Sequence, residues 1–209
     1  MVSLDRYQAY RAAVRALNQQ IMDALVDRAA LKQAARALDI TRGDTFVFES
    51  EAEMNVLMDY ALFEHRVKGQ SLVEIYREQT PLLAPMQREL LDAMCESYAS
   101  LFRMADVIAA DHTIMLVDEL DRRPDVPLVD IMLSRTAEPG MLVFTRVLPL
   151  AEMNMTAGIA FVFPGHLKTS LERRYKRLSK RVKAPTESAR RLVAFFQLNR
   201  TAGIEVTFA

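Results

Sequence analysis

The 209-residue sequence has a single cysteine, no tryptophan and only six glycines, which are scattered along the chain. A lone cysteine, Cys95, excludes an intramolecular disulfide, and no Cys/His cluster with zinc-ligand spacing is present. Scattered glycines form neither a phosphate-binding loop nor a dinucleotide-binding fingerprint. We therefore expect no cofactor and no metal site, and the apolar neighbours of Cys95 favour a core thiol over a reactive one.

Long apolar runs are also missing. No stretch approaches the roughly 20 apolar residues that cross a bilayer, and the segment Met1–Arg6 is polar instead of forming an apolar signal region. We expect a cytoplasmic protein without a membrane partner. Hydrophobic residues make up 51% of the chain and charged residues 26%, which is typical of a globular protein and excludes a disordered one.

Recognisable catalytic patterns are equally scarce. The three histidines, His65, His112 and His166, do not stand in the order of a known catalytic triad, and no serine lies in a G-x-S-x-G context. The sequence identifies no catalytic residue and no small-molecule substrate. An enzyme without a familiar motif is the least favoured of the functions that we consider.

Acidic residues gather between positions 49 and 64, directly before His65. A metal site would need carboxylates and the histidine on one helix face, but His65 points about 100° away from Glu64. We favour a solvated acidic face near a helix N-terminus, where the helix dipole stabilises negative charge. The acidic group comprises Glu49, Glu51, Glu53, Asp59 and Glu64.

Helical periodicity dominates the first 99 residues. Apolar residues follow a 3–4 spacing over 4–38 without glycine or proline, which predicts a long helix in one or two pieces. Its apolar stripe either packs within its own domain, which we favour, or forms a coiled-coil arm. Thr41–Asp44 has turn chemistry and should end this helical segment.

Two capping boxes and a proline mark the next helix starts. Ser50–Glu53 and Ser71–Glu74 each place a serine three residues before a glutamate, so each pair can satisfy backbone donors of a new helix. The first of these helices should run from about 51 to 67 and end at Gly69. A third helix should begin at Pro81 and end near residue 99.

The pattern changes near residue 100. Turn signals now separate short runs of apolar, β-branched and aromatic residues, which is the pattern of strands. The runs are 101–109, 113–120, 127–134, 141–148 and 158–163. They predict a small antiparallel β-sheet or half-open barrel that ends at Pro164.

Twelve methionines are many for this length, and most should fill irregular parts of the core. Met153 and Met155 lie in the segment 151–156, which we predict to be a loop between strands. This pair is therefore a candidate exposed contact for a partner protein.

The C-terminal part returns to helix and carries the clearest charge signal. Leu167, Leu171, Tyr175, Leu178 and Val182 form one apolar stripe on an otherwise basic helix over 166–183. Residues 166–191 hold ten basic and two acidic residues, a net charge of +8 that the rest of this neutral chain balances. A further helix should follow, and then a terminal strand over 204–208.

Three interpretations of the basic helix are open. The first is a charged face that is only solvated, the second is a surface that binds a polyanion such as RNA or DNA by displacing counterions, and the third is a surface that docks an acidic protein. The absence of tryptophan argues against a membrane surface. The candidate contact residues are Lys168, Arg173, Arg174, Lys176, Arg177, Lys180, Arg181 and Lys183.

Together these patterns predict an α+β protein with a helical N-terminal half, a small antiparallel β-sheet or half-open barrel, and C-terminal basic amphipathic helices. We divide it into a helical region, 1–99, a sheet region, 100–164, and a basic helical hairpin with a terminal strand packed on the sheet, 165–209. The favoured function is a non-enzymatic accessory or adaptor protein. It would bind a protein partner, or a second copy of itself, through charged and methionine-rich surfaces, and nucleic-acid binding through the basic helix is the alternative.

Overall fold

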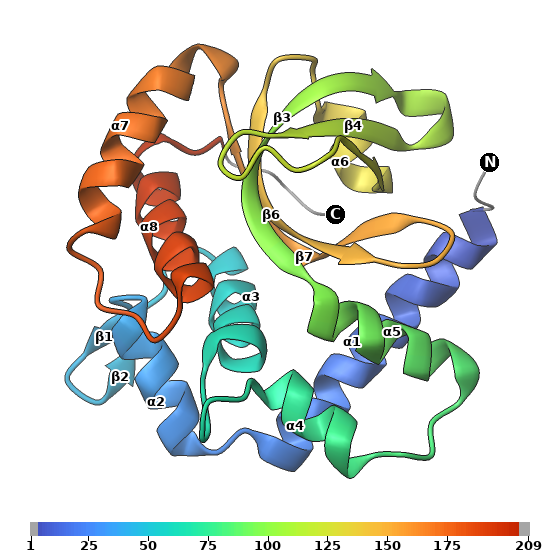
Figure 1. The fold of residues 1–209 in the computed structure, drawn as a ribbon. Coiled ribbons are helices and arrows are strands. Elements are labelled where there is room, and N and C mark those ends of the chain that lie inside the picture. The colour runs from blue at the N-terminus through green and yellow to red at the C-terminus, as the bar shows by residue number, and fades with distance from the viewer. Residues whose placement is uncertain (1–3, 205–209) are drawn as a thin grey trace.

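A computed structural model describes residues 4–204 and confirms the α+β class. A curled five-stranded sheet carries helices on its outside (Figure 1). Helices α1 to α5 come before the sheet in sequence, whereas α7 and α8 follow it and pack beside it. The sequence therefore predicted both the class and the order of the parts.

The long N-terminal helical segment consists of two pieces, α1 (Leu4–Leu25) and α2 (Arg28–Ala37). The break occurs at Asp27, whose carboxylate accepts a hydrogen bond from the Ala30 N–H at 2.7 Å and so caps α2. The apolar stripe of α1, which includes Tyr10 and Leu17, is buried against the chain's own helices α4 and α5. This packing confirms the favoured interpretation over a coiled-coil arm. The hairpin β1 (Thr41–Arg42) and β2 (Thr45–Phe46) follows.

Only one of the two capping boxes forms. Ser71 caps α4 (Leu72–Gln79) through the Glu74 N–H, and Glu74 bonds back to the Ser71 N–H at 2.6 Å. The box at Ser50 is wrong, because α3 (Ala52–Asp59) has no side-chain cap. Its Glu53 instead accepts the Glu49 N–H and is buried.

The helix that begins with α3 changes its winding and ends early. It continues as a π-helix, η1 (Tyr60–Glu64), and stops at Glu64, short of the expected residue 67. Gly69 does adopt a positive φ of 92°, but in a tight turn where Val67 pairs with Gln70. π-Helical turns frequently occur at functional sites.

The third helix, α5 (Pro85–Glu96), starts four residues later than expected. A helix from Pro81 would place Pro85 in its second turn, where the ring clashes with the carbonyl four residues earlier and no N–H is available. Pro85 therefore occupies the first turn itself. The helix ends at Glu96 because the chain turns directly into the first strand of the sheet.

The sheet contains β3 (Tyr98–Ile108), β4 (Thr113–Asp118), β5 (Val126–Val129), β6 (Leu142–Pro149) and β7 (Asn154–Phe163). Strand β3 pairs with β4 and β6, β4 with β5, and β6 with β7, all antiparallel. Strands β5 and β7 meet in parallel through one residue pair, Leu128 and Asn154. The sheet is therefore a half-open barrel with mixed strand directions, whereas we expected antiparallel pairs alone.

Two strand boundaries differ from the prediction. The run 127–134 is a strand only at its start, because Asp130 caps a short helix, α6 (Ile131–Thr136), through the Leu133 N–H. Strand β7 begins at Asn154, not at Gly158. A one-turn helix, η2 (Ala109–Asp111), forms the expected turn between β3 and β4.

The basic hairpin comprises a short turn, η3 (Gly165–Leu167), then α7 (Lys168–Ser179) and α8 (Glu187–Ala202), which Thr186 caps. Ile204 forms an isolated antiparallel bridge with Val162 of β7. The rest of the predicted terminal strand, 205–208, lies outside the described residues.

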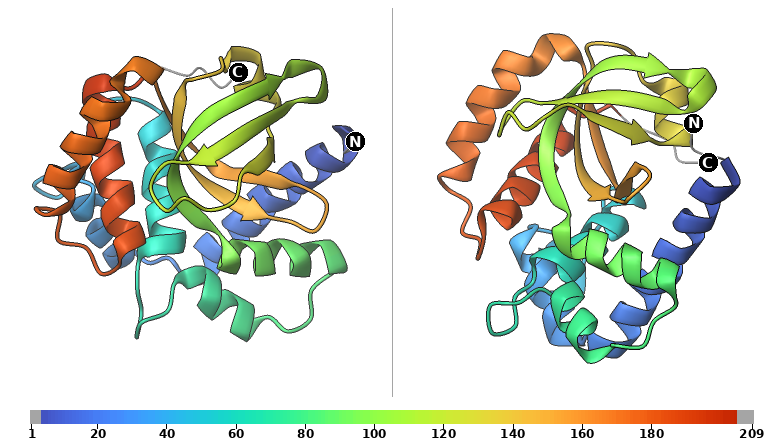
Figure 2. Two further views of the ribbon diagram at one scale, coloured as in Figure 1. Left: turned by 45° about the horizontal axis from the view of Figure 1, so that its top comes forward. Right: turned by 45° about the vertical axis from the view of Figure 1, so that its right-hand side comes forward.

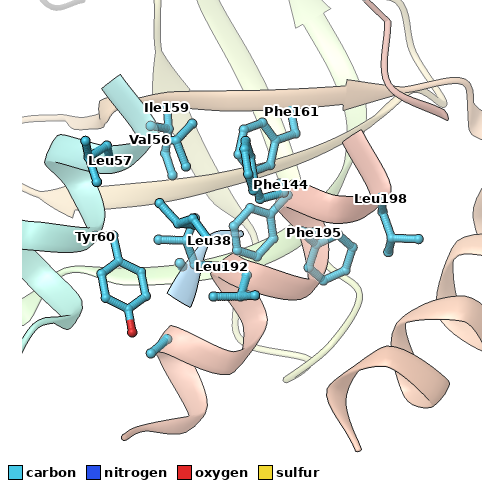
Figure 3. Packing of buried hydrophobic residues seen from close by; sticks show 14 of the residues in the cluster. Leu38, Val56, Leu57, Tyr60, Phe144, Ile159, Phe161, Leu192, Phe195 and Leu198 are labelled. Atoms are coloured by element: carbon cyan, nitrogen blue, oxygen red, sulfur yellow. The ribbon is translucent and has the colours of Figure 1, made fainter. Parts of the chain in front are cut away.

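Three apolar clusters hold these parts together. One fills the barrel around Phe102 and Val143, and a second joins α1, α4 and α5 to the end of β6. The third lies between the outer face of the sheet and α2, α3 and α8 (Figure 3), where the rings of Phe144 and Phe195 stack at 4.5 Å. Figure 2 shows the helices gathered around two sides of the curled sheet.

The methionine pair is not exposed. Met153 is 6% accessible and Met155 is fully buried in the cluster that contains α1 and α5. The expected loop is wrong because β7 begins at Asn154 and the segment before it turns inward onto those helices. Met153 and Met155 are therefore not a contact surface for a partner.

This burial has a measurable consequence. Met155→Ala should lower the free energy of unfolding by about 2–5 kcal/mol, since it empties a closed core site. Met54→Ala, at a position that is 40% exposed, should change it by less than about 0.5 kcal/mol. Urea unfolding of both variants makes the comparison, and equal effects would show that Met155 does not pack as described.

Candidate functional site

Helix α7 presents two chemically different faces. Leu171 is buried, and Tyr175, Leu178 and Val182 pack partly buried against the cluster that contains α8. The ring of Tyr175 stacks on Phe195 at 4.9 Å, and burial raises the pKa of Tyr175 above its ordinary value. The inner face therefore fixes the helix on the protein, and Tyr175 is not available to stack on a nucleic-acid base.

The outer face of α7 and of the turn behind it is cationic. Figure 1 shows α7 at the periphery, with α8 between it and α3. Within residues 4–204, six of the eight predicted basic residues are exposed and have neither an ion pair nor a side-chain hydrogen bond. These six are Arg173, Lys176, Arg177, Lys180, Arg181 and Lys183. We call them the α7 cation surface.

The other two predicted residues are engaged within the protein. Lys168 forms an ion pair with Glu119 at the end of β4, and Arg174 donates a hydrogen bond to the Thr201 hydroxyl at 2.6 Å. Both side chains hold α7 against its neighbours. Six of the eight predicted residues therefore share the exposed surface, and the sequence did not distinguish them from the two that are engaged within the protein.

Acidic residues of the N-terminal half and of the sheet region compensate α8, not the α7 cation surface. Arg200 of α8 forms a two-pronged ion pair with Glu53, at 2.7 and 2.8 Å. Arg191 of α8 binds Asp121 in the same way, and that pairing lowers the pKa of the Asp121 carboxyl. Among the described residues, ion pairs within the protein thus reach α8 and Lys168 at the start of α7, but not the α7 cation surface.

Three more charges meet in the interior, around the π-helix. Arg146 of β6 reaches both oxygens of Asp59 at 3.3 Å and forms an ion pair with Glu64, and its guanidinium lies 4.3 Å from the centre of the Phe63 ring. Glu64 also accepts hydrogen bonds from the hydroxyls of Thr186 and Ser188 at the start of α8. All three charged side chains are at most 5% exposed. This buried ion triad ties the sheet, the π-helix and α8 together.

The prediction of a solvated acidic face is therefore wrong for Glu53, Asp59 and Glu64, which are buried and form ion pairs. Burial raises the pKa of the Asp59 carboxyl above its ordinary value, although Arg146 opposes that shift. Burial alone would lower the pKa of Arg146, but Asp59 and Glu64 keep it above its ordinary value. Two buried carboxylates therefore share one buried cation here.

Two grooves flank strand β7. The larger, of about 920 Å³, lies between α1, α3, α6 and β7 and is lined among others by Arg15, Asn18, Asp59 and Ala160. The smaller, of about 400 Å³, lies between α3, α8 and β7. Both are lined by Asn55 and by Gly158, Ile159 and Ala160. Neither groove was predictable from the sequence, because the walls of both come from segments that lie far apart in the chain.

One wall of the larger groove is fixed by a second polar network. Arg11 of α1 donates to Asp130 at 2.6 Å, to the Thr156 carbonyl oxygen at 2.7 Å and to the Tyr7 hydroxyl at 2.8 Å. Burial raises the pKa of Tyr7, so its hydroxyl stays protonated at neutral pH. These bonds attach α1 to the start of β7 and hold the groove in shape.

The remaining candidates carry little chemistry in the described residues 4–204. Cys95 is half-buried, and burial raises the pKa of its thiol, which makes it a weaker nucleophile than an ordinary cysteine. No group of three or more His, Cys, Asp and Glu side chains in this part of the chain is arranged to hold a metal ion. Helices α1 to α8 include none that is long and apolar enough to cross a membrane.

One comparison with known proteins shows a family, and none shows an activity. The full length, residues 1–209, matches a model described as Family of unknown function (DUF7986). The chain belongs to this family. Neither a curated protein nor a solved structure matched it. Membership of DUF7986 thus assigns no activity, and the geometry of the described residues has to carry any functional argument.

Proposed function

We propose that this protein binds the phosphate backbone of a nucleic acid through the α7 cation surface, without an enzymatic step and in the cytoplasm. The observation that supports the proposal is the set of six exposed cations without an acidic partner in residues 4–204. Lysine and arginine clusters gain affinity for nucleic acid by releasing the condensed counterions of the phosphates.

The geometry of the surface fits a backbone better than a set of bases. Arg173, Lys176, Arg177 and Lys180 follow a 3–4 spacing, so they lie on one side of the helix. From Arg173 to Lys180 the helix rises about 10 Å, the axial span of roughly three base pairs of a duplex. No aromatic side chain projects among them, since Tyr175 packs inward. We therefore expect binding without sequence preference.

The sequence alone favoured a protein partner, but the structure makes a protein partner at this surface the weaker alternative. Protein interfaces usually have an apolar, aromatic-rich centre in which lysine is depleted, whereas nucleic-acid interfaces are polar and strongly positive. The methionine pair that was to supply such a centre is buried. What supports the nucleic-acid proposal is thus a cationic surface without an apolar centre.

Direct binding to two polyanions tests the proposal. A fluorescently labelled DNA duplex of about 20 base pairs and a polyglutamate peptide of the same total charge are titrated with the protein at about 0.1 M salt. We expect at least about tenfold tighter binding of the duplex, because its closely spaced phosphates release more counterions. Equal or tighter binding of polyglutamate would favour an acidic protein partner and contradict the proposal.

A further inference from the structure

Strand β7 has one edge that the described chain leaves almost unpaired. On one side β7 pairs with β6 over residues 154–156 and 160–163, and a β-bulge lies between these two stretches. On the other side, within residues 4–204, its strand partners are Leu128 at Asn154 and Ile204 at Val162. Between these two points, no strand of the described chain lies beside residues 156–160 on this second side.

Hydrogen bonds at either end show which main-chain groups point to the open side. The Val162 carbonyl accepts the Ile204 N–H at 2.8 Å, and the Thr156 carbonyl accepts a guanidinium N–H of Arg11 at 2.7 Å. The Ile159 carbonyl instead accepts the Thr145 hydroxyl of β6 at 2.6 Å. Because the main-chain groups of successive strand residues alternate in direction, the N–H and C=O of Ala160 point outward like those of Val162.

The open edge is uncrowded, and apart from the β-bulge at 157–159 it carries none of the usual protecting features. Natural proteins usually blunt such an edge with lysine, proline or a covering segment, whereas residues 156–160 here read Thr-Ala-Gly-Ile-Ala. Gly158 is exposed with a φ of 135°, and a Cβ there would meet nothing within 4 Å. A glycine inside a strand often marks a place where another backbone approaches closely.

Space for side chains lies on both sides of the edge. The larger and the smaller groove both reach Gly158 and Ala160, so side chains that alternate along an added strand have room in each. Arg15 of α1 lines the larger groove, is exposed and has no ion-pair partner among the described residues. Arg15 therefore offers a cation to an acidic side chain, and the exposed Asp23, which lines the same groove, lies eight residues further along α1.

We propose that the open edge of β7 at Gly158–Ala160 binds an extended segment of a protein partner, which adds to the sheet as an antiparallel strand and directs an acidic side chain toward Arg15. The chain's own Ile204 already occupies the neighbouring position of this edge in antiparallel pairing. Strand addition obtains its affinity from main-chain hydrogen bonds and its selectivity from alternate side chains. The site is separate from the α7 cation surface and does not depend on nucleic-acid binding.

A defined peptide tests this proposal. The probe is acetyl-Thr-Val-Glu-Val-Thr-Val-amide, which favours an extended form and carries one carboxylate. In heteronuclear NMR of the full chain, we expect shifts centred on the Gly158 and Ala160 amides and slower solvent exchange of the Ala160 amide. Shifts confined to other surfaces would overturn the proposal, and so would the absence of shifts both in the full chain and in a chain that ends at Ile204.

N-Methylated peptides separate strand addition from unspecific contact without changing the protein. Methyl groups on the amides of one alternating set should weaken binding roughly tenfold for each hydrogen bond lost, whereas the other set should have little effect. Equal losses from both sets would contradict an added strand.

Two protein variants test the charge and the competition at the edge. Arg15→Glu should weaken binding of the acidic probe several-fold, and the matched Arg28→Glu, exposed on α2, should not. A chain that ends at Ile204 controls for competition by residues 205–209. Binding to both forms, or to the shorter one alone, supports the site, and binding to neither overturns it.

Discussion

Simultaneous replacement of three outward cations, Arg173→Glu, Arg177→Glu and Lys180→Glu, is expected to weaken duplex binding by roughly two to three orders of magnitude at 0.1 M salt. Each lost phosphate contact removes about 0.9 from the slope of log affinity against log salt. The three substitutions therefore remove close to three counterions from the binding equilibrium. Fluorescence anisotropy with the labelled duplex measures the change.

The matched control reverses three exposed cations elsewhere, Arg28→Glu, Arg36→Glu and Arg42→Glu, and so changes the net charge equally. This control should retain most of the affinity, because only a local surface and not the overall charge carries the binding. Thermal unfolding of both triple variants checks that they fold. Similar losses in the two would show that α7 has no special part in binding.

Arg146→Met is expected to lower the free energy of unfolding by about 3–5 kcal/mol. Asp59 and Glu64 would then be left buried without their cation, and Glu64 would keep only the two hydroxyl donors from the start of α8. An uncompensated charge in the interior is far less stable than a solvated one. Urea unfolding at neutral pH measures the loss.

Arg103→Met is the comparison for this second prediction. Arg103 lies on the neighbouring strand β3 and pairs with Glu119 at 3.1 Å, but its side chain is 40% exposed. Its loss should cost no more than about 1 kcal/mol, since solvent screens such a pair. Removing the carboxylates together with the cation, as Arg146→Met with Asp59→Asn and Glu64→Gln, should recover part of the stability. Equal losses at Arg103 and Arg146 would contradict a buried triad.

Local patterns predicted most of the helices because each depends on neighbouring residues. The apolar stripe from Leu167 to Val182 predicted α7, and the spacing of Ser71 and Glu74 predicted the cap of α4. The same logic failed at Pro81, where a second proline four residues later decided the helix start. It also failed at Ser50, where Glu53 pairs with Arg200 from the far end of the chain.

The interior of the candidate site was less predictable because distant segments build it. Asp59 and Glu64 resembled a solvated acidic face until Arg146, more than 80 residues away in sequence, supplied their cation. One signal was present: Arg146 is a lone charge in the apolar strand Leu142–Pro149, and such a residue requires a buried partner. The open edge of β7 had no sequence signal, since it depends on where β5 and Ile204 end their pairing.

The salt dependence of duplex binding tests the central claim most directly. The affinity of the unmodified protein is measured between about 0.05 and about 0.2 M salt, as log affinity against log salt concentration. If three to six cations of the α7 cation surface contact phosphates, the slope of log affinity against log salt should lie between about −3 and about −5. A slope near zero, or no measurable binding at the lowest salt, would contradict a function in nucleic-acid binding.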